Sequence, residues 1–258
     1  MAAFSVVTNI ASSTAQSNMM STSVGLQKAL NRLSSGLRIN YSGDDAAGLA
    51  VANGYRADVA IVNQGIRNAN DGLSTLQISD GALGNISTLL DRLATLSTQA
   101  ASGGLDATVV GNLDTEFQAV VSEIDREAGS VSSGAFSVFL GDSTITDTIA
   151  TTDAAALGLD SLSLGTDAAG ALDAVKAAVT TLGTAQSKIG SLENNLQYAI
   201  GLAQSQVVNT QAAESRIRDA NIAEESANMT RYNILTQSGV AALAQANQSS
   251  SAILTLLR

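Results

Sequence analysis

Two adjacent carboxylates, Asp44 and Asp45, stand out in a chain whose charged residues make up only 14% of the total. They follow Gly43 at the end of the glycine- and serine-rich stretch "LSSGLRINYSG". Neighbouring carboxylates can hold a divalent cation, and a glycine-rich loop can cradle a phosphate. The stretch is therefore a metal site, a phosphate site or a bend between helices.

The spacing of these residues fits neither ligand. A metal needs several converging oxygens, but adjacent side chains on a helix diverge by about 100°, and the next carboxylate is Asp58. The phosphate-loop string Gly-x-x-x-x-Gly-Lys-Ser/Thr does not occur in the sequence. A structural role fits better, because Asp44 can accept hydrogen bonds from the free N–H groups of a helix that starts at Asp45 or Ala46. Both charges then favour the positive end of the helix dipole. We therefore predict that Gly43, Asp44 and Asp45 form a helix cap and joint.

The absence of four residue types narrows the chemistry. The chain contains no Cys, His, Pro or Trp. Zinc clusters, cysteine nucleophiles and serine hydrolases with an imidazole base all need Cys or His. We therefore expect no enzymatic activity, no catalytic residue, no cofactor and no metal. Because proline breaks helix interiors, its absence also permits very long helices.

Charge and hydropathy remove two further classes. The formal net charge of −10 leaves no basic stripe of the kind that nucleic-acid binding requires. No apolar run reaches the roughly 20 residues that span a bilayer, so we expect no stable membrane insertion. The N-terminal stretch "MAAFSVVTNIASSTAQ" lacks the basic start and continuous apolar segment of a cleavable secretory signal. Two alternatives remain: a cytoplasmic protein, or export by a route without a cleaved peptide.

Apolar residues recur at three- and four-residue steps along most of the chain, the spacing of helices that pack lengthwise. We predict one helix over about residues 46–101, a shorter one to about residue 128 and a second long one from about residue 166. "SSG" at residues 34–36 predicts the end of the first helix. The N-terminal seam consists of Leu26, Leu30, Leu33 and Leu37; the second long helix carries Val175, Val179, Leu182, Ile189, Leu196, Ile200, Ala203 and Val207; and the last segment carries Val240, Leu243, Ala246, Ile253 and Leu257.

The pattern changes in residues 134–153, where aromatic and β-branched residues flank "GDST". This arrangement predicts a β-hairpin. The expected fold is therefore mainly α. It is a long antiparallel helical bundle or coiled coil from paired N- and C-terminal segments, with a small β-hairpin region at the middle of the chain.

The stretch "LNRLSSGLRIN" is followed by "DDAAGLAVAN", and further along the chain come "IRNANDGLSTLQISDGAL" and "EIDREA". These stretches closely resemble the N-terminal signature of bacterial flagellins. The likeness returns in "SRIRDANIAEESANMTRYNILTQSGVAALAQANQ" near the C-terminus. The likeness covers about the first 130 and the last 85 residues. The chain is thus similar to a short flagellin that lacks large outer domains.

The resemblance implies a domain organisation. In flagellins the two terminal segments form an inner tube and the long helices form an outer tube around it. The implied domains are an inner-tube helix at 1–33, a spoke or joint at 34–45, an outer-tube helical domain at 46–213 with a β element near 134–165, and a C-terminal joint and inner-tube helix at 214–258. The implied filament interface comprises Leu26, Leu30, Leu33, Leu37, Arg38, Val240, Leu243, Ile253, Leu254, Leu256 and Leu257.

The function implied by the resemblance is structural. The chain would polymerise into the bacterial flagellar filament, outside the cell, after export without a cleaved signal peptide. The alternative within the family is a hook–filament junction protein, which shares the paired terminal helices. The implied partners are further copies of the chain in a helical homopolymer, the flagellar export apparatus, an export chaperone, and the filament cap and hook-junction proteins.

Overall fold

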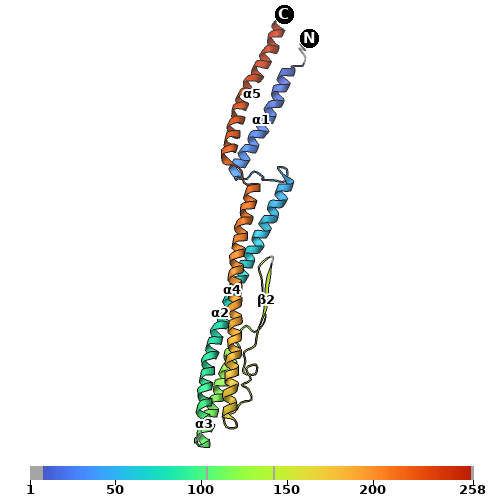
Figure 1. Cartoon of the computed structure of the whole chain (residues 1–258). Helices are drawn as coiled ribbons and strands as arrows, with labels where there is room; N and C mark the ends of the chain where they lie inside the picture. Colours follow the sequence, from blue (N-terminus) through green and yellow to red (C-terminus); the bar gives the residue numbers. More distant parts are fainter. Residues whose placement is uncertain (1–7, 103, 142, 257–258) are drawn as a thin grey trace. The chain divides into compact units, whose positions relative to one another are not determined.

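The computed structural model describes residues 8–102, 104–141 and 143–256, with side chains as far as residue 249. The chain divides into two compact units. The terminal unit comprises residues 1–57 and 210–258, and the middle unit comprises residues 58–209. The elements, shown in Figure 1, confirm a mainly α fold with one small hairpin: α1 (Ile10–Ser35), α2 (Ala46–Ala101), α3 (Ala107–Ala128), β1 (Gly134–Phe139), β2 (Thr144–Ile149), α4 (Ala168–Arg218) and α5 (Ile222–Leu256).

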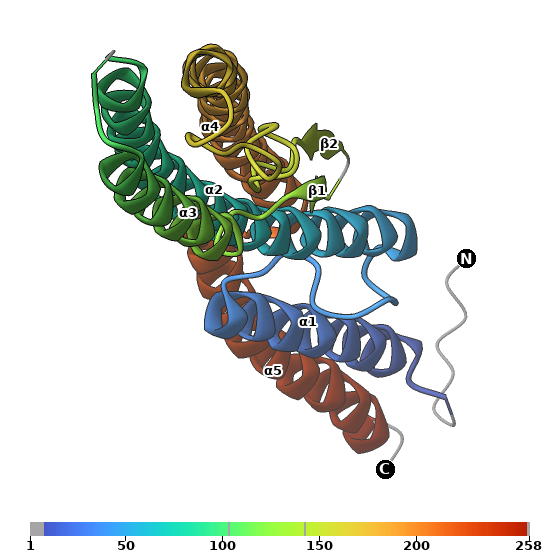
Figure 2. The ribbon, with the colours of Figure 1, turned by 90° about the horizontal axis from the view of Figure 1, so that it is seen from below.

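The terminal unit is built on α1 and α5, which lie side by side and antiparallel (Figure 1, Figure 2). The helices come close where one of them has a glycine. A Cβ atom at Gly25 would lie only 2.6 Å from the ring of Tyr232, and one at Gly239 would contact Met19. The pair nevertheless buries little. Among the described side chains of the whole terminal unit, the buried apolar residues are Ala29 in α1, Ile39 in the segment after α1 and Ala52 in α2.

The middle unit has a continuous core of its own. Side chains from α2, α3, α4, the hairpin and the segment after it form one buried cluster. Figure 2, which views the molecule from below, shows α2, α3 and α4 surrounding this region together with the two strands. The buried residues of α2 recur at steps of three, four or seven residues, which keeps them on one face of the helix: Ala69, Leu76, Leu83, Ile86, Leu90 and Leu93. Such a core stabilises the unit by roughly 25 cal/mol for each Å² of apolar surface removed from water.

The predicted hairpin is present, with β1 and β2 antiparallel and Phe139 opposite Thr144. Phe136, Val138 and Leu140 are buried, while the alternate residues of β1 face outward. The hairpin packs on α2 at a glycine. A Cβ atom at Gly65 would lie 2.4–2.6 Å from the backbone of Leu140. Only a residue without a side chain lets the two backbones approach this closely.

The buried side of α4 differs in part from the predicted seam. Val175, Leu182, Ile189 and Leu196 are buried as expected, but Val179 is 42% exposed. Its expected place in the core belongs to the preceding residue, Ala178; the other core alanines of the helix are Ala171, Ala185 and Ala203. Small alanines carry a weak apolar signal in a sequence, yet they allow a neighbouring helix to approach closely.

This packing predicts opposite effects of one substitution at two positions of α2. Gly65→Ala should lower the free energy of unfolding by about 1–3 kcal/mol, because the new methyl group overlaps the Leu140 backbone. Gly84→Ala is the matched control, because a Cβ atom there meets nothing within 4 Å. It should raise stability by up to about 1 kcal/mol through helix propensity. Urea unfolding followed by circular dichroism measures both, and equal effects would contradict the described docking of the hairpin.

Candidate assembly interface

The joint after α1 is fixed by backbone hydrogen bonds. Gly36 ends the helix in the left-handed conformation, with φ of 72°, and its N–H donates to the Arg32 carbonyl at 2.9 Å. This confirms the predicted helix end at "SSG". The N–H of Arg38 then donates to the Arg218 carbonyl at 2.7 Å, and the N–H of Ala220 donates to the Gly36 carbonyl at 2.9 Å. The segment between α1 and α2 is therefore held to the turn between α4 and α5.

The Arg38 side chain reinforces this connection. Its Nε and Nη2 atoms donate to the Ile217 carbonyl at 3.2 and 2.7 Å. That carbonyl belongs to the last turn of α4, where carbonyl groups lack helical partners and a positive charge is favourable. Arg38 thus has a role within one copy of the chain. Its expected contact with other copies remains a prediction.

The helix cap at the start of α2 is Asp45, and the expectation for Asp44 is wrong. Asp45 Oδ1 accepts from the N–H of Gly48 at 2.9 Å, and the Asp45 carbonyl accepts from the N–H of Leu49 at 3.0 Å. The reason is positional: α2 begins at Ala46, and the cap is the residue immediately before the first helical one. Of the two adjacent carboxylates, only Asp45 stands at that position.

Asp44 instead turns back toward α1. Its Oδ1 atom lies 2.8 Å from Lys28 Nζ, and its Oδ2 atom accepts from the N–H of Asn40 at 3.3 Å. The Asp44 side chain is only 3% exposed. The hydrogen bond from the Lys28 ammonium group is the main reason why the pKa of Asp44 lies below its ordinary value, although burial works in the opposite direction. This pair fastens the joint to α1.

Gly43 has a steric role in the joint. A Cβ atom at Gly43 would lie 2.6 Å from the ring of Tyr41. Its φ is not among the positive values of the chain, so the turn does not depend on a left-handed glycine. The residue leaves space for the tyrosine ring, which lies against the joint.

An ion pair that the sequence did not reveal joins the two terminal helices. Arg32 Nη1 lies 2.9 Å from Glu225 Oε1, and the glutamate is 8% exposed. Glu225 stands in the first turn of α5, where Asn221 Oδ1 accepts from the N–H groups of Ala223 and Glu224. Asparagine followed by two glutamates is a helix-start signal and could have located this end of α5. The partner of Glu225 lies 193 positions away, beyond the reach of local patterns.

The predicted seam residues are only partly covered. Leu26, Leu33 and Leu243 are half-buried, whereas Leu30 and Val240 are exposed. Leu37 is half-buried but does not belong to a helical seam, because α1 ends two residues earlier and Leu37 bridges to Asp219 in the joint. Ile253, Leu254 and Leu256 lie where α5 is described without side chains, and Leu257 lies outside the described residues. Their expected roles stay predictions.

The terminal helix pair leaves many large apolar side chains in water. A contiguous apolar patch usually marks an interaction surface, and two helices alone cannot enclose all their apolar positions. The unit can therefore bury this surface only by contacting further chains. The large apolar residues that are exposed on α1 and α5 are Ile10, Met20, Val24, Leu30, Ile222, Ile234, Leu235 and Val240.

Comparison with known families identifies both ends of the chain. Residues 6–144 match the family model of the bacterial flagellin N-terminal helical region. Residues 172–257 match that of the bacterial flagellin C-terminal helical region. Together the two matches leave only residues 145–171 in the middle unassigned.

Individual relatives are similar in sequence to this chain along nearly its whole length. The chain is 36% identical to a flagellin of Halalkalibacterium halodurans over 90% of this chain and 92% of the relative. It is 34% identical to the flagellar filament 33 kDa core protein of Treponema phagedenis over 97% and 98% of the two chains. A solved structure of a putative flagellar hook-associated protein from Vibrio parahaemolyticus covers 68% of this chain and all of its own, with a TM-score of 0.55 and 14% identity. At that identity the likeness concerns the fold alone.

In the described part of the chain, no helix combines the length and hydropathy needed to cross a membrane.

Substitution by asparagine should affect stability differently at the two aspartates of the joint. Asp44→Asn removes the charge that binds Lys28 and should destabilise the assembled polymer by about 1.5–3 kcal/mol per copy at neutral pH. Asp45→Asn is the matched control, because asparagine caps helices as well as aspartate does. Urea dissociation of the polymer, followed by light scattering, compares the two variants.

The same pair predicts a pH dependence. Because folding lowers the pKa of Asp44, its stabilising contribution is fully present above its unfolded pKa of about 4. That contribution is lost as the pH falls through the lower folded pKa. The difference in stability between the original chain and Asp44→Asn should therefore shrink below about pH 4. A difference that stays constant down to pH 2 would show that the ion pair does not hold the joint.

Proposed function

Because the chain belongs to the bacterial flagellin family, we propose that it acts as the repeating subunit of a flagellar filament, with its terminal helix pair as the main contact between copies. The observation that carries this proposal is the number of large apolar residues that α1 and α5 leave exposed. The relatives named flagellin or flagellar filament core protein support the same role. The hook–filament junction alternative is not favoured, since its support is a likeness of fold.

The proposed arrangement gives the segments separate tasks. Residues 1–33 and 214–258 form the inner tube, residues 34–45 form the spoke, and residues 46–213 form the outer tube. The seams, with Leu26, Leu30, Leu33, Val240 and Leu243, contact other copies, while the joint holds the two segments together. The larger outer domains of other flagellins have no counterpart of similar size, because only residues 145–171 lie between the two family matches.

The proposal extends to partners and route. The chain would leave the cell through the flagellar export apparatus, escorted by a chaperone and without a cleaved signal peptide. It would then meet the filament cap and the hook-junction proteins outside the cell. The role is structural and uses no catalytic residue, cofactor or metal. It rests on packing between identical copies.

The C-terminal tail provides the sharpest test of the proposal. Ile253, Leu254, Leu256 and Leu257 would together supply roughly 6–12 kcal/mol at about 1.5–3 kcal/mol per buried side chain. Ordering the tail costs about 1–2 kcal/mol per residue in backbone entropy. The margin is small, so deleting residues 252–258 should abolish polymerisation while leaving the middle unit folded. Electron microscopy tests polymerisation, and circular dichroism tests the fold.

A matched control separates apolar burial from tail length. The double variant Ser249→Ala with Thr255→Ala changes one polar position just before the tail and one within it, and it should still form filaments. The double variant Leu254→Ser with Leu257→Ser should fail like the deletion. Normal filaments from the truncated chain would mean that the tail does not contribute to the inner tube, and the proposed contact between copies would have to be abandoned.

A further inference from the structure

The charges of the chain are distributed unevenly between the two units. Residues 58–209 contain 17 acidic and five basic residues, whereas the terminal segments contain six acidic and eight basic ones. The middle unit therefore has a formal charge of −12, from five basic minus 17 acidic residues, and the terminal segments have a small positive charge. Copies that pack along their middle units bring these negative charges together, and matching them with cations of a neighbouring copy removes the cost of like-charge contacts.

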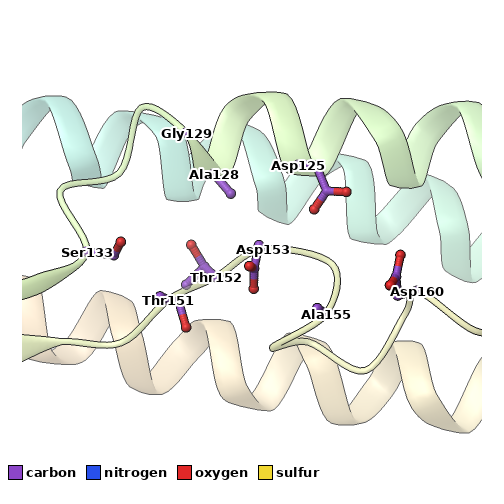
Figure 3. Close-up of a pocket in the computed structure, with 9 residues that line it drawn as sticks. All are labelled: Asp125, Ala128, Gly129, Ser133, Thr151, Thr152, Asp153, Ala155 and Asp160. Atoms are coloured by element: carbon purple, nitrogen blue, oxygen red, sulfur yellow. The ribbon is translucent and has the colours of Figure 1, made fainter.

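A cavity of about 430 Å³ in the middle unit gathers part of this negative charge. It lies between the end of α3 and the segment that follows β2, and Asp125, Asp153 and Asp160 border it (Figure 3). Asp125 holds the segment in place, because its Oδ1 atom accepts from the N–H of Ala154 at 2.7 Å. Asp153 Oδ1 accepts from the N–H of Ala156 at 2.9 Å. Among the described residues, Asp160 has neither a hydrogen bond nor an ion pair.

A buried hydroxyl group in the same cavity also lacks a partner. Thr152 lines the cavity and is only 2% exposed, and its Oγ1 atom makes no hydrogen bond with the described residues. Figure 3 shows this side chain at the centre of the cavity lining, directed toward the space beside Ala128. An unsatisfied buried hydroxyl costs about 1–3 kcal/mol. The cavity thus presents three carboxylates and an unused acceptor to an incoming group.

The chemistry of the cavity selects an organic cation. Within the described part of the chain, no three acidic side chains converge closely enough to hold a metal ion. A guanidinium group is larger, and its five N–H donors can serve two carboxylates and a hydroxyl oxygen together. The cavity has room for such a side chain with accompanying water molecules, each of which takes about 30 Å³.

The middle unit also contains a guanidinium group without an acidic partner. Its other four cations, Arg92, Arg126, Lys176 and Lys188, form ion pairs within the same copy. Arg67 is exposed and donates only to the neutral Gln64 Oε1, at 3.1 Å from Nε and 2.5 Å from Nη2. Arg67 is therefore the described cation of this unit that remains available for a carboxylate elsewhere.

Arg67 and the cavity lie at different positions along the axis of α2. The Ser132 N–H donates to Ser79 Oγ at 3.0 Å, and Asn85 Nδ2 donates to Glu127 Oε2 at 3.1 Å. These bonds place the cavity beside residues 79–85 of α2, about 18–27 Å along the helix from Arg67 at 1.5 Å per residue. A contact between two different patches of identical copies is heterologous, and with such an offset it generates an open helical polymer.

We propose that the cavity bordered by Asp125, Asp153 and Asp160 receives the Arg67 side chain of a neighbouring copy of this chain. The contact rests on the proposed filament function and names one of its lateral contacts. It fixes the offset between neighbouring copies, compensates part of the negative charge of the middle unit and gives the Thr152 hydroxyl a partner.

Crosslinking tests the contact directly, because the chain has no cysteine of its own. Filaments are grown from an equal mixture of Arg67→Cys and Asp160→Cys variants and treated with a short bismaleimide. A crosslinked dimer should form in the mixture and be absent from either variant polymerised alone. A mixture of Lys176→Cys and Asp160→Cys is the matched control and should remain uncrosslinked.

A double-mutant cycle gives an independent readout through the critical concentration for polymerisation. Arg67→Gln and Asp160→Asn should each raise it by about threefold to tenfold, and the combined variant should be no worse than either alone. Lys176→Gln removes the same charge as Arg67→Gln and should change it by less than about twofold. If net charge alone mattered, Asp160→Asn would lower the critical concentration and the two cation variants would behave alike.

The outcomes distinguish this contact from the filament function itself. Filaments that form from the mixed Arg67→Cys and Asp160→Cys variants but give no crosslink, or variant effects that multiply independently, would overturn the contact and leave the filament function intact. A chain that forms no filaments under any condition would overturn the proposed function, and the contact with it.

Discussion

The arrangement depends on one constraint, which is that two helices packed side by side can bury only one face of each. In the terminal unit this leaves Ala29 as the buried apolar residue of α1, while Leu30 and Val240 stay in water. Further copies of the chain are the natural cover for the remaining faces, as in any coiled-coil assembly. The family membership and the exposed faces both support the proposal that the terminal unit acquires its full stability only in the polymer.

The middle unit meets the opposite requirement. Its core is closed within one copy, and the close approach of Gly65 to Leu140 holds the hairpin on α2. A subunit with this division can keep a folded body before assembly and complete its terminal packing on arrival. The joint lies between α1 and α2. The ion pair of Asp44 with Lys28 and the hydrogen bond from Arg38 to the last turn of α4 hold its path.

The sequence predicted the regular elements well because their signals are local. Apolar residues at three- and four-residue steps predicted a helix over about residues 46–101, and α2 spans Ala46–Ala101. Aromatic and β-branched residues predicted the hairpin of β1 and β2. Site details were less accessible. The apolar spacing predicted Val179 as a core residue, whereas the smaller Ala178 is the buried one. The predicted helix cap was Asp44, whereas the observed cap is the next residue, Asp45. The pair of Arg32 with Glu225 joins opposite ends of the chain, and only the folded structure brings such residues together.

Hydrogen exchange measured by mass spectrometry on single copies and on filaments can show whether assembly stabilises the terminal helix pair. Amide protection reports the free energy of local opening. Amides of α1 and α5 should exchange rapidly in the single copy and become protected in the filament. Those at the core positions of α2, α3 and α4 should be protected in both states. Equal protection of α1 and α5 in the two states would show that the helix pair is stable by itself, and it would contradict the conclusion that assembly completes the terminal unit.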